Sequence, residues 1–350
     1  MSEHPSLALP ILHEQEKLET SSPKRSAVKL ALGFKLSELT DENLAYALQL
    51  GVTHAIVEGP RLGDRGVLEF LDLLRLRKRI ESCGLEVAGI ENLPVDHWDK
   101  ILHGAPGRDE QIEKVCETLE NMGRAGFPIL GYYFSIAGVW GHWRSYDSGG
   151  GRGGAGVKSF DYDLVKDAPS VPTGPVSVEE MWSRLLYFLE RVIPVAERAG
   201  VKLAAHPDDP PAEELRGAAR ILTSHEAMKR LVEAIPSPSN GLEFCQGTVA
   251  EMGPDRAIEA IRTFGGQKKI FYVHFRNVRG RFPKFDEVFI DEGDVDMFEA
   301  MRAYREVGFD GVMTPDHTPR VVGDTPFRHR GMAFALGYMK ALAQVVDKRS

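Results

Sequence analysis

Long apolar runs, an excess of positive charge and a cysteine framework are all missing from this chain of 350 residues. No apolar run reaches the roughly 18 to 20 residues that a membrane-spanning helix needs, so we expect no membrane segment. Lysine and arginine total 43 against 51 aspartates and glutamates, and the net charge of −8 argues against nucleic acid or an anionic membrane as the main partner. Three cysteines are too few for a disulfide framework, which favours a reducing, cytoplasmic location.

The amino-terminal segment lacks a secretory signal. Residues 1–28 mix charges with prolines and contain no continuous apolar stretch of the kind that signal peptides carry. We therefore expect these residues to form a flexible N-terminal arm ahead of the folded part of the chain.

Short apolar runs alternate with amphipathic segments through the rest of the chain. Strands are expected at 30–34, 54–59, 86–92, 129–134 and 201–205, and then in the segments NGLEFC, IFYVH and GVMT. Helices are expected from a Thr40 cap to Gly51, over 65–82 and 109–125, from a Ser177 cap to Gly200, and over 330–346. Eight such units predict an α/β fold, a single-domain (β/α)8 TIM barrel over residues 29–350. No GxGxxG motif follows the first strand, so no dinucleotide-binding fingerprint is present.

A segment rich in glycine and tryptophan interrupts this alternation at about 137–160. It has two interpretations: a flexible surface loop, or a mobile lid whose aromatic base closes over a small substrate. On the second interpretation, Trp143 and Arg144 are candidates for substrate binding.

Four successive strands end in a side chain that can bind a metal. The chain places His206, Cys245, His274 and Asp316 at these strand ends, each about one strand–helix unit after the one before. Because the carboxyl ends of barrel strands form one face, we predict that these four side chains share a metal centre. Two imidazoles, a thiolate and a carboxylate suit Mn²⁺, Fe²⁺, Co²⁺ or Zn²⁺. Each residue taken alone also has an ordinary interpretation, as a hydrogen-bonded core histidine, a buried apolar cysteine or a helix-capping aspartate.

Acidic residues lie close to these strand ends. Asp208 and Asp209 follow His206 between prolines, where we expect them to hold the turn and to orient the imidazole behind the metal. A direct catalytic role is the alternative. Glu91 ends the third expected strand and is a candidate for facing the same centre and binding substrate, unless it forms a salt bridge inside the barrel.

Basic and amide side chains follow the seventh and eighth strands. Arg276 lies two residues after His274, on the same face of an extended strand, and is a candidate for clamping a substrate carboxylate. An ion pair with a neighbouring acid is its alternative. Asn277 is a further substrate-binding candidate. His317 is a candidate proton carrier because imidazole titrates near neutral pH, or else a partner of the metal site.

Several segments together resemble the D-mannonate dehydratase family of xylose-isomerase-like TIM barrels. They are IENLPVDHWDKILHGAPGRD (90–109), AHPDDPP (205–211), NGLEFCQG (240–247), VHFRNV (273–278) and DVDMFEAMRAYREVGFDGVMTPDH (294–317). They follow one another in the family's order and span most of the region between residues 30 and 345.

The resemblance implies a carbon–oxygen lyase (hydro-lyase) that acts on a small sugar acid, D-mannonate or a related aldonate. In that family a proton leaves C2 and hydroxide leaves C3, which gives a 2-keto-3-deoxy acid. The resemblance also implies Mn²⁺ as the favoured ion, with His206, Cys245, His274 and Asp316 as its ligands. His317 matches the family's acid/base beside the metal aspartate, and a homo-oligomer is expected.

The chain departs from the family pattern where the substrate is expected to bind. Ala333 stands at the position of a catalytic tyrosine, with His329 or Tyr338 as possible replacements. The segments FKLSELT (34–40) and YYFSIAGVWGHWR (132–144) also differ from the family. Two alternatives to dehydration therefore stay open: a metal-dependent sugar or sugar-acid isomerase or epimerase, and a non-catalytic homologue that binds a sugar acid.

Overall fold

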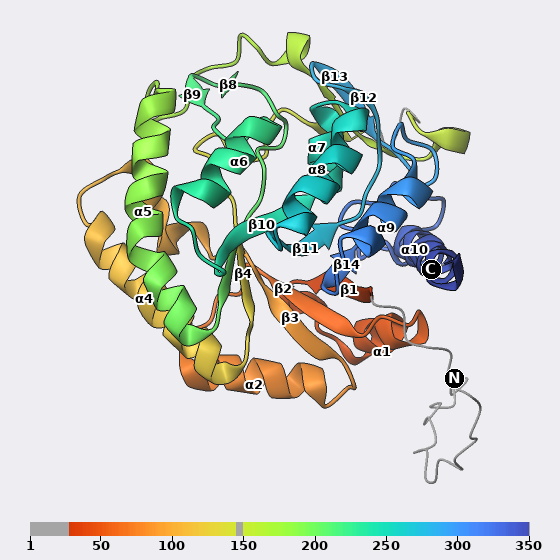
Figure 1. The fold of residues 1–350 in the computed structure, drawn as a ribbon, viewed down its shortest axis with the longest axis horizontal. Helices are drawn as coiled ribbons and strands as arrows, with labels where there is room; N and C mark the ends of the chain where they lie inside the picture. Colours follow the sequence, from red (N-terminus) through yellow and green to blue (C-terminus); the bar gives the residue numbers. More distant parts are fainter. Residues whose placement is uncertain (1–27, 145–149, 350) are drawn as a thin grey trace, which may run out of the picture.

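Eight parallel strands close into a barrel at the centre of the molecule (Figure 1). The structure is a computed structural model and describes residues 28–144 and 150–349. The barrel strands are β1 (Lys29–Phe34), β2 (His54–Glu58), β3 (Glu86–Glu91), β4 (Ile129–Tyr132), β7 (Lys202–Ala205), β10 (Asn240–Cys245), β11 (Ile270–His274) and β14 (Val312–Thr314). They follow the order β1-β14-β11-β10-β7-β4-β3-β2 around the barrel, which confirms the predicted (β/α)8 architecture. The predicted arm lies outside the described residues, Val28 excepted.

Helices surround the barrel on its outer face (Figure 1). They are α1 (Asp41–Gln49), α2 (Phe70–Glu81), α3 (Asp99–His103), α4 (Arg108–Ala125), α5 (Val178–Ala199), α6 (His225–Ala234), α7 (Gln246–Glu251), α8 (Pro254–Gly266), α9 (Met297–Glu306) and α10 (His329–Arg349). Short 3-10 turns span Leu36–Glu38, Val95–His97, Arg152–Gly154 and Tyr162–Leu164. Across the described ranges, no helix is both long enough and apolar enough to cross a membrane.

Local capping signals decide where several helices begin. Thr40 accepts a hydrogen bond from the Asn43 amide, and Ser177 forms a reciprocal capping box with Glu180. The second predicted helix was placed too early, because α2 begins at Phe70. Gly66 has a left-handed φ of 73°, and the Leu68 amide donates to the Thr118 hydroxyl on α4. Both features hold the chain in an extended approach before the first helical turn.

The barrel interior is apolar at the end where the strands begin. A cluster that includes Ala31, Ile56, Ala88, Tyr272 and Val312 fills it. A much larger apolar core lies between the strands and the helices, as expected for a layered α/β fold. Polar side chains are consequently concentrated at the carboxyl end of the barrel.

A second, antiparallel sheet lies over the carboxyl end of the barrel. It joins β12 (Val278–Arg281), β13 (Lys284–Glu287), β6 (Lys158–Asp161) and β5 (Trp143–Arg144) in that order, while β8 (Glu214–Leu215) pairs with β9 (Ala218–Ala219). In Figure 1 the labels of β12 and β13 lie at the top of the view, as do those of β8 and β9. The predicted lid segment thus supplies β5 and β6, while residues 145–149 lie outside the described chain. The lid motion itself stays a prediction.

Candidate active site

A cavity of about 600 Å³ opens where the barrel strands end. Its lining residues are Glu91, Asn92, Tyr133, Val139, Trp140, Gly141, His142, Lys158, Val165, His206, Asp209, His274, Asp316 and His317. The volume falls within the range of about 300–1,000 Å³ typical of small-molecule sites. The lining combines charged and histidine side chains with apolar and aromatic ones such as Val139, Trp140 and Val165. We call this space the barrel cavity.

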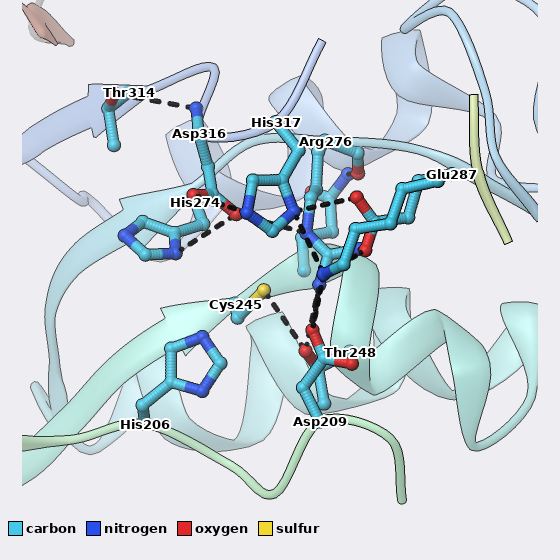
Figure 2. Close-up of polar contacts among 12 residues, drawn as sticks. His206, Asp209, Cys245, Thr248, His274, Arg276, Glu287, Thr314, Asp316 and His317 are labelled. Atoms are coloured by element: carbon cyan, nitrogen blue, oxygen red, sulfur yellow. Dashed lines mark hydrogen bonds and ion pairs between the residues drawn. The ribbon is translucent and has the colours of Figure 1, made fainter. Parts of the chain in front are cut away.

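Three of the predicted metal ligands converge at this cavity. His206 follows β7, Cys245 ends β10, and His274 ends β11, opposite Cys245 in the parallel register. One possible ligand atom from each side chain lies within 4.8 Å of the other two, and Figure 2 shows the three side chains turned toward one another. Two nitrogens and a sulfur at this separation can be bridged by one cation with bonds of about 2.0–2.3 Å.

Asp316 lies beside this group, in the turn that follows β14. It has a left-handed φ of 56°, which turns its carboxylate back toward the strand ends. Oδ2 of Asp316 is 3.4 Å from Nδ1 of His274 and 3.1 Å from Nε of Arg276. The structure therefore brings all four predicted ligands to one place, with Asp316 adjacent to His274 and outside the tight group of three.

The charges within this group favour the ionised forms of the Cys245 and His206 side chains. Burial opposes ionisation of the Cys245 thiol, but Arg276 and His206 outweigh it and hold the pKa of this thiol well below its usual range. Burial favours neutral His206, but the Cys245 thiolate outweighs it and raises the pKa of His206 to about 10. The donor set of one sulfur and two imidazole nitrogens fits a divalent cation of borderline softness. Because a metal binds the deprotonated imidazole, such binding would release a proton from His206.

Arg276 is a buried hub rather than a cavity residue. Its side chain is 2% exposed, and its nitrogens donate to Asp316, Glu251, Asp209 and Thr248 at 2.8–3.1 Å. The predicted clamp on a substrate carboxylate differs from this arrangement, because the protein's own carboxylates occupy the guanidinium. The ion-pair alternative is the one that the structure shows.

His317 is held at the cavity wall by a buried carboxylate. Its Nδ1 lies 2.6 Å from Oε2 of Glu287 and 3.4 Å from Nζ of Lys158 (Figure 2). Burial opposes ionisation of Glu287, but Arg276, His317 and Lys158 outweigh it and hold the pKa of this carboxyl well below its usual range. A carboxylate at Nδ1 favours the tautomer that carries its proton there, which leaves Nε2 to exchange a proton with a ligand.

The two aspartates after His206 act on other partners. Asp208 accepts a hydrogen bond from the Leu222 amide and therefore holds the turn, as predicted. Asp209 contacts Arg276 at 2.8 Å. His206 is oriented by neither carboxylate, because its Nδ1 lies 2.5 Å from the backbone oxygen of Pro207.

Among the other predicted substrate residues, Glu91 reaches the centre, whereas Asn277 and Trp143 do not. Oε2 of Glu91 is 3.2 Å from Nε2 of His274. Asn277 lies outside the barrel cavity because its amide is bonded to backbone groups of the β12 to α9 region. Trp143 is 39% exposed and lies outside the cavity lining. The backbone of Arg144 on β5 pairs with the backbone of Lys158 on β6.

The two suggested replacements for the missing tyrosine lie elsewhere. Nε2 of His329 is 2.9 Å from Oδ1 of Asn43, and neither His329 nor Tyr338 belongs to the described cavity lining. Neither residue can therefore replace the tyrosine at the centre in this conformation.

Sequence reasoning missed several polar residues of the centre. Glu243 lies two residues before Cys245, so the alternation of a strand was a usable signal for its inward direction. Its Oε1 is 3.1 Å from Nε2 of His274, and burial together with Glu91 raises the pKa of Glu243 to about 8. Lys158 lies on β6 of the second sheet and His142 directly precedes β5, and no local pattern marked them as cavity residues.

Comparisons with known proteins agree with this geometry. The sequence profile described as D-mannonate dehydratase (UxuA) matches residues 37–171 and 173–350. The mannonate dehydratase of Thermotoga petrophila is 30% identical over 341 residues, which cover 85% of this chain and 91% of that protein. The crystal structure of mannonate dehydratase from Streptococcus suis serotype 2 superposes with a TM-score of 0.80 at 26% identity, over 92% of this chain and 94% of the other.

A more distant solved structure shares the fold alone. The D-psicose 3-epimerase of Clostridium cellulolyticum H10 has a TM-score of 0.59 at 14% identity, over 90% of this chain and 99% of that chain.

Proposed function

The chain belongs to the D-mannonate dehydratase family, and from that membership we propose that it dehydrates D-mannonate or a related aldonate to a 2-keto-3-deoxy acid. The observation that carries the proposal is the group of His206, Cys245 and His274 at a cavity that His317 also lines. This arrangement supports the proposal that a cation and a proton carrier act on one substrate in this cavity.

We propose that a divalent cation binds at this group, with Mn²⁺ favoured and Fe²⁺, Co²⁺ or Zn²⁺ as alternatives. His206, Cys245 and His274 would hold it, with Asp316 as the fourth ligand. A cation bound there would act as a Lewis acid that increases the acidity of the C2 proton and stabilises negative charge on the substrate carboxylate. The buried nitrogen and sulfur donors of the site support this proposal.

The chain's own residues then orient substrate and move protons. His317 has Nε2 available to take the C2 proton, and Glu287 stabilises the imidazolium that results. Among the described lining residues, Lys158 is the one lysine or arginine. It lies against Glu287 and Asp209 and offsets their negative charge, which lowers the repulsion of an anionic substrate. Trp140 and Tyr133 supply aromatic walls that exclude water from part of the cavity.

Ala333 at the position of the family tyrosine keeps a second candidate function open. An isomerase or epimerase of a sugar or sugar acid needs proton exchange at carbon but no acid for a leaving hydroxyl. The group around His274 and His317 supports that chemistry equally well. A homologue that binds a sugar acid without turnover is the third possibility.

Incubation of the purified protein with Mn²⁺ and D-mannonate, followed by NMR, distinguishes these functions. A 2-keto-3-deoxy acid is the expected product, and its formation should stop when EDTA removes the cation. A product that retains all hydroxyl groups would support the isomerase, and bound metal without any product across aldonates and aldoses would support the binding protein.

We also propose a cytoplasmic homo-oligomer. The low cysteine count supports the location, and the family membership supports the assembly. Light scattering of the purified chain tests the assembly, and a monomer at micromolar concentration would contradict it.

A further inference from the structure

Besides His317 and the two proposed cation ligands His206 and His274, one more histidine, His142, lies on the wall of the barrel cavity. It directly precedes β5, its side chain is 5% exposed, and the rings of Phe160 and Phe285 pack at centroid distances of 5.2 and 5.7 Å. Its Nε2 is 3.1 Å from Oδ1 of Asp209. Both ring nitrogens are buried without a hydrogen bond to the described residues, and Nε2 is the one that faces Asp209. The imidazole is therefore fixed by packing and has one nitrogen to offer to a ligand.

The surroundings of His142 repeat those of His317. Each imidazole lies against a buried carboxylate, Asp209 for one and Glu287 for the other. The same two cations link these carboxylates. Lys158 lies 2.8 Å from Glu287 and 3.9 Å from Asp209, and Arg276 lies 3.5 Å from Glu287 and 2.8 Å from Asp209.

This network argues against a metal as the partner of His142. One possible ligand atom each of His142, Asp209 and Glu287 lies within 4.8 Å of the other two, which alone would allow a cation. Lys158 and Arg276 already contact both carboxylates and supply the positive charge that a cation would bring. What remains is a pair of carboxylate-supported imidazoles that line one cavity.

Dehydration of a sugar acid requires two groups that transfer protons. One group removes the C2 proton, and a second protonates the C3 hydroxyl, because hydroxide is a poor leaving group. His317 adjoins Asp316, one of the proposed cation ligands, and is therefore the group nearer the substrate carboxylate and C2. His142 directly precedes β5, and it is the remaining imidazole that can act on the hydroxyl of the next carbon, C3.

We propose that His142 is the acid that protonates the departing C3 hydroxyl, a role that rests on the dehydration proposed above. The C2 proton passes to Nε2 of neutral His317, and the C3–O bond breaks. His142 enters this step as an imidazolium whose Nε2 proton faces Asp209, and its Nδ1 proton leaves with the oxygen as water. The resulting enol becomes the keto acid when C3 takes the proton from His317. The enol hydroxyl returns its proton to His142, so both imidazoles end as they began.

The variant His142→Gln tests this role with three substrates or labels. With Mn²⁺ and D-mannonate, kcat should fall by about 10²- to 10⁴-fold, as expected when a general acid is lost, while KM changes little. With 3-deoxy-3-fluoro-D-mannonate the leaving fluoride needs no proton, so the variant should approach the wild-type rate. In D2O the variant should still exchange the C2 proton of mannonate, because His317 is intact.

Matched controls separate this role from a structural one. His225→Gln, on the outer helix α6 and packed against Phe264, should keep wild-type kcat. Metal content and thermal unfolding of His142→Gln and His142→Asn should match the wild type. Loss of metal or of fold in both variants would show a structural role and overturn the proposal.

The remaining outcomes distinguish the two proposals. A wild-type protein that forms no keto acid from any aldonate would overturn the proposed function and this inference with it. An active wild type with an undiminished His142→Gln variant would overturn the inference alone. An equal loss with the fluoro substrate would show that His142 positions the substrate and donates no proton.

Discussion

Cys245 is the residue whose chemistry depends most on its neighbours. Arg276 and His206 hold the pKa of its thiol well below the usual range in spite of complete burial. These neighbours therefore favour the thiolate, which is the form that binds metals.

Cys245→Ser should lower the affinity for Mn²⁺ at least tenfold, and for Zn²⁺ more, because a serine hydroxyl stays protonated and is a harder ligand. Metal content after dialysis, measured by mass spectrometry, checks this. Cys116→Ser, on α4, is the matched control and should keep its metal. Equal metal content in both variants would remove Cys245 from the ligand set.

The carboxyl group of Glu58, at the end of β2, should make the free energy of unfolding depend on pH. Burial, with Glu91 and Asp316 adding to it, raises the pKa of Glu58 from 4.5 to about 7. Because the folded state binds this proton more tightly than the unfolded state, Glu58 lowers stability progressively as pH rises from about 4.5 to 7. Glu58→Gln should therefore raise the free energy of unfolding by about 1–3 kcal/mol at pH 8 and leave it nearly unchanged at pH 4.5.

Urea denaturation of both proteins at the two pH values measures this difference. Glu233→Gln, on the exposed face of α6, should stay within about 0.5 kcal/mol of the wild type at either pH. A destabilised Glu58→Gln at pH 8 would mean that the ionised carboxylate is the favoured form.

At the scale of elements, the barrel strands leave space inside for the polar layer below the cation site. Gly131 on β4 is the clearest case, because a Cβ there would contact the Tyr272 hydroxyl and would lie 2.6 Å from Oε2 of Glu243. Gly131→Ala should lower the free energy of unfolding by about 1–3 kcal/mol, the usual cost of overpacking a core. Chemical denaturation checks the value.

Gly266→Ala is the matched control for this prediction. Gly266 ends α8, and a Cβ there would meet nothing within 4 Å. The substitution should be neutral or stabilise by up to about 1 kcal/mol, since alanine favours helix over glycine. A Gly131→Ala variant as stable as Gly266→Ala would mean that the barrel layer tolerates the methyl group.

At the scale of the whole molecule, cation binding should stabilise the fold. A ligand that binds the folded state alone, at a concentration 100 times its Kd, adds about 2.7 kcal/mol. For a chain of this length the gain corresponds to a rise in Tm of about 3 to 5 °C. Thermal unfolding with Mn²⁺ against EDTA measures it, and Cys245→Ser should show a smaller rise. A Tm that is the same with Mn²⁺, Zn²⁺ and EDTA would contradict a cation site.

The architecture and the candidate ligands were predictable because their signals are local. Each barrel strand is a short apolar run that its own sequence marks, and eight such runs with helices between them favour a closed barrel. The positions of His206, Cys245 and His274 follow from the same pattern, since a residue at the end of a parallel strand lies at the carboxyl end of the barrel. Their role as metal ligands stays a prediction that the geometry supports.

The partners of the polar side chains could not be predicted in this way. Arg276 and Asn277 follow a strand as expected, but their donors are directed to groups far away in the sequence, such as Asp209 and Ile290. The sequence alone thus determined the barrel and which strand ends carry ligand-type residues. The tertiary structure decided that His142 and Lys158 also line the cavity, because their position depends on long-range pairing of β6 with β13 and on no local periodicity.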